Sequence, residues 1–274
     1  MPDETRVEEH VGPPAPPKPA EFKFIRCRSE GAVARLTLDR PEHNLLNERM
    51  LIELAAGIEW LGEQGEVKLI ILDSAGQTFS GGIELGEYSP QRIFQMVDAF
   101  YSAFAAMLDT GKPLLAIVNG PAFGGGAELA ALCDLVVATA QARFAQTEIK
   151  FGTFPPLAAV ILPYIVGPRL ALELVLTGET ITAERAKELG LVNRLVPEEK
   201  LEKTVNELVA QVTAQSGPVL RMAKKAILGG MGLPLREGMR HSMNLFLNEL
   251  CQLEDPQEGL RAVLEKRQPH WKNR

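Results

Sequence analysis

The stretch VNGPAFGGGAEL, residues 118–129, decides the fold class because one kind of secondary structure ends in it and another begins. It overlaps the apolar run KPLLAIVNG, which predicts a buried strand, and it leads into GGAELAALCD, which predicts a short helix. Three consecutive glycines, Gly124 to Gly126, stand between the two. The sequence therefore predicts a buried strand that turns sharply into a helix.

The same alternation of strand and helix signals extends outward from this stretch. Residues 45–62 carry leucine and isoleucine at helical spacing, and the run VKLIILD at residues 67–73 is typical of a buried strand. Residues 89–110 again show a helical pattern, and LVVATA at residues 135–140 again predicts a buried strand. This alternation predicts an α/β fold with largely parallel strand pairing.

The two ends of the chain differ from this central region. Residues 1–20 combine charge with six prolines and few large apolar side chains, which predicts a disordered tail. Residues 21–41 predict a hairpin of two strands, and beyond Pro155 helical patterns replace strand patterns. We expect one core over residues 21–215 and a helical region over residues 216–274. Its methionines and leucines would pack on that core or on a neighbouring subunit.

Composition excludes several classes of protein. A net charge of -6 argues against a nucleic-acid binder, which would be basic. Cys27, Cys133 and Cys251 are far apart and show no metal-ligand spacing, so we expect a reducing compartment. No apolar run is long enough to span a bilayer, and the N-terminus does not resemble a secretion signal. The expectation is a cytoplasmic protein with no nucleic-acid or membrane partner.

Two glycine-containing loops are candidates for a ligand site. The first turn of a helix leaves N–H groups unpaired, so the one after Gly124 can bind an anion or a developing oxyanion. A tight turn that needs small residues only for packing explains the glycines equally well. A second loop, residues 78–85, also follows a buried strand, and the two loops can meet at the carboxyl edge of a sheet. Neither loop matches a dinucleotide or triphosphate motif.

Two glutamates are candidates for acid–base chemistry. Glu128 lies in the helix after the glycines, and Glu148 lies in the stretch FAQTEI, which reads as short and extended. A single glutamate such as Glu148 is more often an exposed loop charge. Paired at one pocket, the two would suit proton transfer to and from a water molecule. The four histidines are scattered and no nucleophilic serine motif occurs, so no metal site or serine hydrolase is predicted.

Taken together, these motifs resemble the crotonase superfamily, which contains the enoyl-CoA hydratases and isomerases. The order and spacing of the motifs carry the resemblance, which covers about residues 22–271. The motifs, besides the two loops and the Glu148 segment, are DRP at 39–41, NLLN at 44–47, LTGE at 176–179, residues 183–193, EG at 258–259 and LEKR at 264–267.

The resemblance implies both a fold and a reaction. Members fold as a spiral of ββα units with a C-terminal helical region that forms trimers or dimers of trimers. It assigns the oxyanion-hole amides to Ile83 and Gly125 and the hydratase acid–base pair to Glu128 and Glu148. The substrate would be an acyl-CoA thioester, with no separate cofactor and no metal. Its CoA part would lie along His43, Leu45, Glu84, Leu85, Gly86 and Gly124.

Departures from the family pattern refine this expectation. Family members often have a small residue at the position of Ile83 and an aspartate at that of Glu84. Residues 87–92 and 152–157 look like the cyclohexa-1,5-diene-1-carbonyl-CoA hydratases of aromatic degradation. The presence of both glutamates favours hydration over two alternatives. One is an enoyl-CoA isomerase, and the other is a non-catalytic protein of this fold that binds acyl-CoA or RNA.

Overall fold

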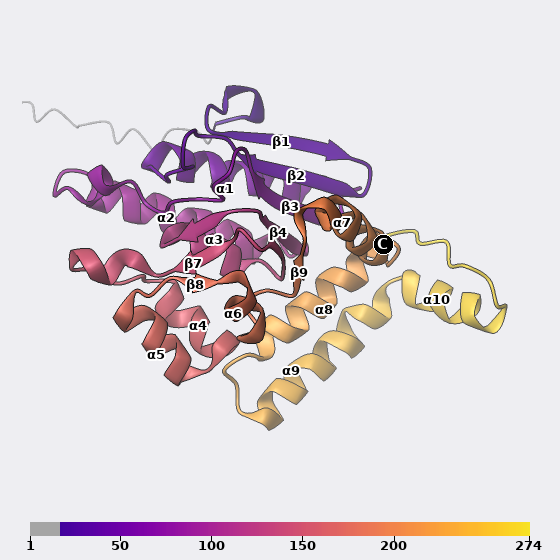
Figure 1. The fold of residues 1–274 in the computed structure, drawn as a ribbon. Helices are drawn as coiled ribbons and strands as arrows, with labels where there is room; N and C mark the ends of the chain where they lie inside the picture. The colour runs from indigo at the N-terminus through magenta and orange to yellow at the C-terminus, as the bar shows by residue number, and fades with distance from the viewer. Residues whose placement is uncertain (1–16) are drawn as a thin grey trace, which may run out of the picture.

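The large β-sheet of this protein grows by one strand at a time along the chain (Figure 1). It is seen in a computed structural model that describes residues 17–274, so most of the predicted N-terminal tail lies outside the described residues. The strand order is β1-β2-β3-β4-β6-β9. These strands are β1 Ile25–Glu30, β2 Val33–Leu38, β3 Leu69–Ser74, β4 Leu114–Val118, β6 Leu135–Thr139 and β9 Arg194–Val196.

The pairing of these strands follows the prediction. β1 and β2 form the expected antiparallel hairpin, in which Ile25 faces Leu38 and Glu30 faces Val33. Every later pair in this sheet is parallel, as strands joined by helical crossovers are. The predicted α/β class with largely parallel strands is confirmed.

A second, smaller sheet has the order β5-β7-β8 and was not predicted. Its strands are β5 Pro121–Phe123, β7 Arg143–Ala145 and β8 Ile181–Thr182. Each is two or three residues long, too short to show a periodic pattern, and β5 begins with a proline. After β4 the chain enters β5, and after β6 it enters β7, so the chain alternates between the sheets. This alternation produces the expected spiral.

Ten helices cover the sheets in the described part of the chain. They are α1 Glu48–Glu63, α2 Ile93–Asp109, α3 Gly125–Leu132, α4 Ala158–Val166, α5 Pro168–Thr177, α6 Ala183–Glu188, α7 Glu198–Thr213, α8 Gly217–Gly230, α9 Leu235–Asn248 and α10 Asp255–Leu264. Helix α1 begins at the N-cap Asn47, whose side-chain oxygen accepts a 2.9 Å hydrogen bond from the Met50 N–H. Helices α1 and α2 pack together on the main core.

The segment around Glu148 departs from the prediction. Only Phe144 and Ala145 of the stretch expected to be extended lie in a strand, β7. Residues Thr147–Phe151 form a 3-10 helix, η3, so the expectation of an extended Glu148 was wrong. The turn ends at Gly152, which has a φ of 83°, a conformation that glycine adopts without strain. Other one-turn helices are η1 Pro19–Glu21, η2 Leu85–Tyr88 and η4 Leu250–Gln252.

Helices α8 to α10 project from the core as an arm (Figure 1). The Lys224 ammonium of α8 donates a 2.8 Å bond to the Asp134 carboxylate and so ties the arm to the end of α3. The C-terminal residues return toward α7, where the Trp271 indole N–H donates to the Ala214 carbonyl at 2.6 Å. The proposed boundaries between tail, core and helical region stay predictions. No helix within residues 17–274 has the length and apolar character needed to cross a membrane.

Two loops at one end of the sheets approach each other so closely that only glycine fits between them. A Cβ atom at Gly120 would lie 1.9 Å from the Gln77 carbonyl oxygen, and one at Gly126 would lie 2.5 Å from the Ser80 carbonyl oxygen. A Cβ at Gly82 would lie 2.7 Å from the Phe123 oxygen. Backbone atoms cannot rotate away as a side chain can, so these three positions require glycine.

We therefore expect Gly120→Ala to lower the free energy of unfolding by about 3 kcal/mol, the upper end of the cost of overpacking. Urea denaturation measures it. The matched control is Gly65→Ala, because a Cβ there meets no atom within 4 Å. It should change the free energy of unfolding by less than about 0.5 kcal/mol. Equal unfolding midpoints for the two variants would contradict this account of the loops.

Candidate active site

The site is built where these two loops meet. Two isolated bridges join its backbone segments, one between Leu46 and Ile83 and one between Ser80 and Ala122. In the first, the Leu46 N–H donates to the Gly82 oxygen and the Glu84 N–H donates to the Leu46 oxygen, both at 2.8 Å. The bridge therefore uses the Gly82 carbonyl and the Glu84 N–H, the groups on either side of Ile83. The Ile83 N–H itself therefore points to the opposite side.

The start of α3 packs against the Ile83 side chain. A Cβ built on Gly125 would touch the Ile83 side chain at 3.3 Å, so the two residues are direct neighbours. Gly125 is the first residue of α3, where an N–H group has no partner within the helix. Gly124, with a φ of 48°, makes the turn into the helix. The structure thus brings together the two predicted oxyanion-hole amides, Ile83 and Gly125.

Glu128, three residues after Gly125, is buried, with 1% of its surface exposed. Its Oε1 accepts hydrogen bonds from the N–H groups of Leu157 at 2.9 Å and Ala158 at 2.7 Å, at the beginning of α4. Burial raises the pKa of Glu128 to about 8, and the charge of Glu148 adds to this, against the lowering effect of the two N–H donors. Glu128 is thus a carboxyl group that exchanges a proton near neutral pH.

Glu148, in η3, lies on the other side of Gly124. A Cβ at Gly124 would lie 2.3 Å from Glu148 Oε1, and only 3% of the Glu148 surface is exposed. Its Oε2 is buried and has no hydrogen-bond partner in the described part of the chain. Burial raises the pKa of Glu148, opposed by its own N–H and by that of Gly125. The Glu148 carboxylate therefore lies beside the backbone of Gly124 and Gly125, and it is near enough to Glu128 for its charge to raise the pKa of Glu128.

Most of the residues predicted to bind CoA lie on the loop of Ile83 and on the segment bridged to it, whereas Gly124 is buried at the turn into α3. The Gly81 N–H donates to the His43 carbonyl oxygen at 2.8 Å, and Leu45 packs against Gly81. Leu85 is 69% exposed and Gly86 is exposed beside it. Glu84 differs from these, because its carboxylate forms a 2.7 Å ion pair with Arg40.

Three polar side chains hold the loops in place, and the sequence predicted a role for none of them. They are Arg40, Asn44 and Ser80. The Arg40 guanidinium donates to the Leu45 carbonyl at 2.6 Å. The Asn44 amide donates to the carbonyls of Ala75 at 3.0 Å and Thr78 at 2.8 Å. The Ser80 hydroxyl donates to the Asn44 carbonyl at 2.8 Å. The motifs at 39–41 and 44–47 contained Arg40 and Asn44, but nothing in their spacing indicated these bonds.

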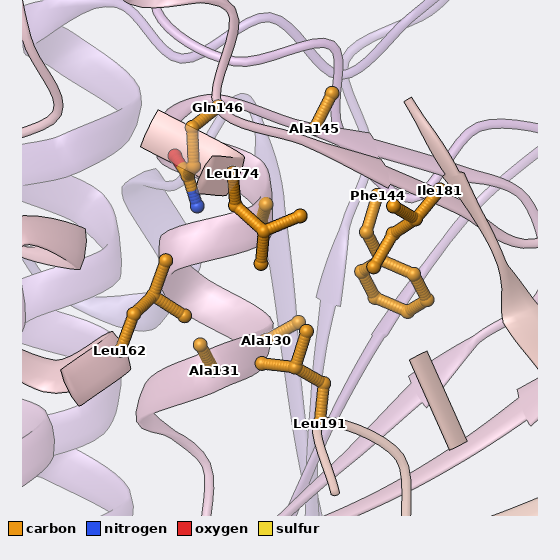
Figure 2. A pocket seen from close by; sticks show the side chains of 10 residues that line it. Ala130, Ala131, Phe144, Ala145, Gln146, Leu162, Leu174, Ile181 and Leu191 are labelled. Atoms are coloured by element: carbon orange, nitrogen blue, oxygen red, sulfur yellow. The ribbon is translucent and has the colours of Figure 1, made fainter. Parts of the chain in front are cut away.

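A small cavity behind α3 is distinct from this site (Figure 2). It is lined almost wholly by alanine, leucine and other apolar side chains, and its polar member is Gln146. The Gln146 Oε1 is buried without a hydrogen-bond partner in residues 17–274. Neither Glu128 nor Glu148 lines the cavity. Within the described residues no group of three or more His, Cys, Asp or Glu side chains could hold a metal ion.

Comparison with known proteins identifies the family. The family model described as enoyl-CoA hydratase/isomerase matches residues 28–274. The chain belongs to the enoyl-CoA hydratase/isomerase family. It is 33% identical to a probable mitochondrial enoyl-CoA hydratase of Dictyostelium discoideum, over 93% of this chain and 92% of that protein. It is also 33% identical to a cyclohexa-1,5-dienecarbonyl-CoA hydratase of Thauera aromatica, over 89% and 95% of the two chains.

Solved structures agree with this family assignment. The crystal structure of an enoyl-CoA hydratase from Bacillus anthracis matches with a TM-score of 0.87 and 29% identity, over 92% of this chain and all of that one. The predicted crotonase fold is confirmed, and the family shows this chain to be an enzyme of the enoyl-CoA hydratase kind.

The buried position of Glu128 has a measurable consequence for stability. Its pKa in the folded protein, about 8, lies above the ordinary value of 4.5 that applies in the unfolded chain. As the pH rises, the unfolded chain therefore loses this proton at a lower pH than the folded protein does. The stabilising contribution of Glu128 is complete below that ordinary value and is lost as the pH rises through the folded pKa.

We expect the wild type to lose stability relative to Glu128→Gln between about pH 5 and 8, by up to about 1.4 kcal/mol per pH unit. Denaturant unfolding at several pH values measures this difference. The control is Glu63→Gln, which removes an exposed carboxylate of α1 and should show no such trend. A stability difference that stays constant across this range would show that Glu128 is not buried as described.

Proposed function

We propose that this enzyme adds water to the double bond of an α,β-unsaturated acyl-CoA thioester, as a hydro-lyase. The observation that carries the proposal is the pair of buried carboxyl groups, Glu128 and Glu148, at the turn into α3, where Gly125 is a direct neighbour of Ile83. The names of the family relatives support it. The CoA part belongs to the substrate, and no further cofactor is needed for the chemistry.

The thioester carbonyl oxygen would accept hydrogen bonds from the Ile83 and Gly125 N–H groups. Water attacks the β carbon, and the electron pair of the double bond moves onto this oxygen as an enolate. Preformed donors stabilise that developing charge, and losing one typically raises the barrier by about 3–4 kcal/mol. Helix α3 starts at Gly125, so its dipole acts in the same direction.

The two glutamates would divide the proton transfers. Glu128 takes a proton from the attacking water as the C–O bond forms, and Glu148 gives a proton to the α carbon. Glu148 suits the second role because it lies against Gly124, next to the amide of Gly125 and so near the carbon adjacent to the carbonyl. Burial raises the pKa of both carboxyl groups, which suits groups that take up and release protons during a reaction cycle.

Cyclohexa-1,5-diene-1-carbonyl-CoA is our finer candidate for the substrate, on the strength of the relative from Thauera aromatica and of the segments at 87–92 and 152–157. The depth of the acyl pocket depends on how Phe94, Met96, Phe104, Phe154 and Leu157 pack. These side chains differ in exposure. Met96 and Phe104 are buried in the core, whereas Phe94 and Phe154 are exposed. The last two are therefore free to contact an acyl group.

We also propose that the enzyme assembles as a homotrimer or a dimer of trimers. Large apolar side chains are exposed along the arm, and contiguous apolar surface marks a contact between proteins. They are Leu235, Met239, Met243, Phe246 and Leu247 of α9 and Leu260, Val263 and Leu264 of α10. Packing of these side chains on a neighbouring subunit would cover a surface that one chain leaves open.

The acid pair is tested by removing each proton-transfer group while keeping its shape. We expect Glu128→Gln and Glu148→Gln each to lower kcat for hydration at least 100-fold, the usual contribution of acid–base catalysis. Spectrophotometric loss of the enoyl thioester measures the rate, and equal CoA-thioester binding serves as the folding control. Full activity in the double variant would refute the hydratase proposal.

Labelled water separates hydration from the two alternatives. A hydratase incorporates ¹⁸O from water as a hydroxyl group on the acyl chain. An isomerase moves the double bond and leaves the product free of ¹⁸O. A non-catalytic protein that binds acyl-CoA or RNA leaves the enoyl thioester unchanged. Mass spectrometry of the product distinguishes these results.

The substrate class is tested with crotonyl-CoA, a long-chain enoyl-CoA and a cyclic dienoyl-CoA. We expect the highest kcat/KM for the cyclic compound. A preference for the long chain would reject the cyclic candidate while keeping the hydratase assignment. Failure on all three substrates would favour the isomerase.

A further inference from the structure

Tyr88 lies at the catalytic pair without a role in the proposed mechanism. It is the last residue of η2, the turn that begins two residues after the Ile83 amide. Its ring meets the ring of Phe151 edge to face, with centroids 5.3 Å apart and planes at 66°. Phe151 ends η3, the turn that contains Glu148. The contact therefore joins the loop that carries Ile83 to the turn that carries Glu148.

The geometry of η3 decides which way this contact faces. In a 3-10 helix, residues i and i+3 project on the same side, one above the other. Glu148 and Phe151 are three residues apart within η3, so the two side chains share one side of the turn. A ring that packs on Phe151 consequently stands on the side where the Glu148 carboxylate lies.

The Tyr88 hydroxyl is a donor with no partner of its own in residues 17–274. Burial raises the pKa of Tyr88, and the charges of Glu148 and then Glu128 raise it further, while no hydrogen bond contributes. The phenol thus stays protonated and lies in the field of both carboxylates without bonding directly to either. The Glu148 Oε2 is likewise without a hydrogen-bond partner in this part of the chain, and it is buried.

We propose that Tyr88 is a third catalytic side chain, whose O–H donates a hydrogen bond to the oxygen atom that is added to the β carbon. This inference rests on the proposed hydration. Water that donates its protons toward two carboxyl groups keeps two lone pairs. One lone pair attacks the carbon and the other can accept from Tyr88, which fixes the orientation of the attack. The same donor would bind the new hydroxyl group of the product.

The neighbouring Glu87 fixes the turn that carries Tyr88. Glu87 is 1% exposed, and its Oε1 accepts a 2.9 Å bond from the Arg92 guanidinium at the start of α2. This ion pair ties η2 to α2 and fixes the turn from which Tyr88 projects. Tyr88 packs against the main core on its other side. A phenol whose ring is fixed by Phe151 and by the core can orient a reacting oxygen without a large loss of side-chain entropy.

The test compares a reaction that contains the added oxygen with one that lacks it. Tyr88→Phe keeps the ring and removes the hydroxyl. Hydration of crotonyl-CoA needs the β oxygen, whereas exchange of the α protons of butyryl-CoA with deuterated water, followed by NMR, uses only the oxyanion hole and one glutamate. We expect kcat for hydration to fall about ten-fold, the size of one lost hydrogen bond, with KM within two-fold and exchange unchanged.

Two variants serve as controls. Tyr101→Phe removes the hydroxyl of an exposed tyrosine on α2 and should change neither reaction. Phe151→Leu removes the ring contact and leaves the Tyr88 hydroxyl, so it should disturb hydration and exchange together. If Tyr88→Phe showed that joint pattern, or left hydration intact, the proposal would be overturned. A wild type that hydrates no thioester would instead refute the proposed function.

Discussion

The close approach of two backbone loops is the constraint on which the rest of the site depends. Where Gly120 and Gly126 pass Gln77 and Ser80, the two backbone segments leave no room for a methyl group between them. This packing fixes the start of α3 against the loop of Ile83, and two amides from distant parts of the sequence become neighbours. From the sequence, the glycines are explained either by tight packing or by ligand binding. In the structure both explanations require the same residues.

Burial gives the site its chemistry at the expense of stability. Glu128 would be a stronger acid if it were exposed, since two N–H groups of α4 already favour its charged form. Burial outweighs those bonds and raises its pKa. Sites that hold a proton near neutral pH are commonly built in this way, and the unfavourable burial of a carboxyl group must be offset by the packing of the surrounding core.

The sequence predicts the central fold because strands such as β3 and β4 are long apolar runs and α1 and α2 have a helical pattern. It fails where an element is too short for a period, as for β5, or where tertiary contacts decide, as for the 3-10 turn at Glu148. The ion pair of Arg40 with Glu84 joins residues 44 positions apart, which no local pattern indicates. For the same reason, only family resemblance suggested that Glu128 and Glu148 meet.

The spiral itself explains why these groups converge. Each turn of the spiral runs through a strand of the large sheet and then crosses to the small sheet or to an isolated bridge. The chain therefore leaves the large sheet toward the same side each time. The turn after β3 supplies the Ile83 amide and, through η2, Tyr88. The turn after β4 supplies Gly125 and Glu128, and the turn after β6 supplies Glu148. Three successive turns of the spiral thus contribute, in chain order, the first proposed donor, then the second donor together with the proposed base, and then the proposed acid.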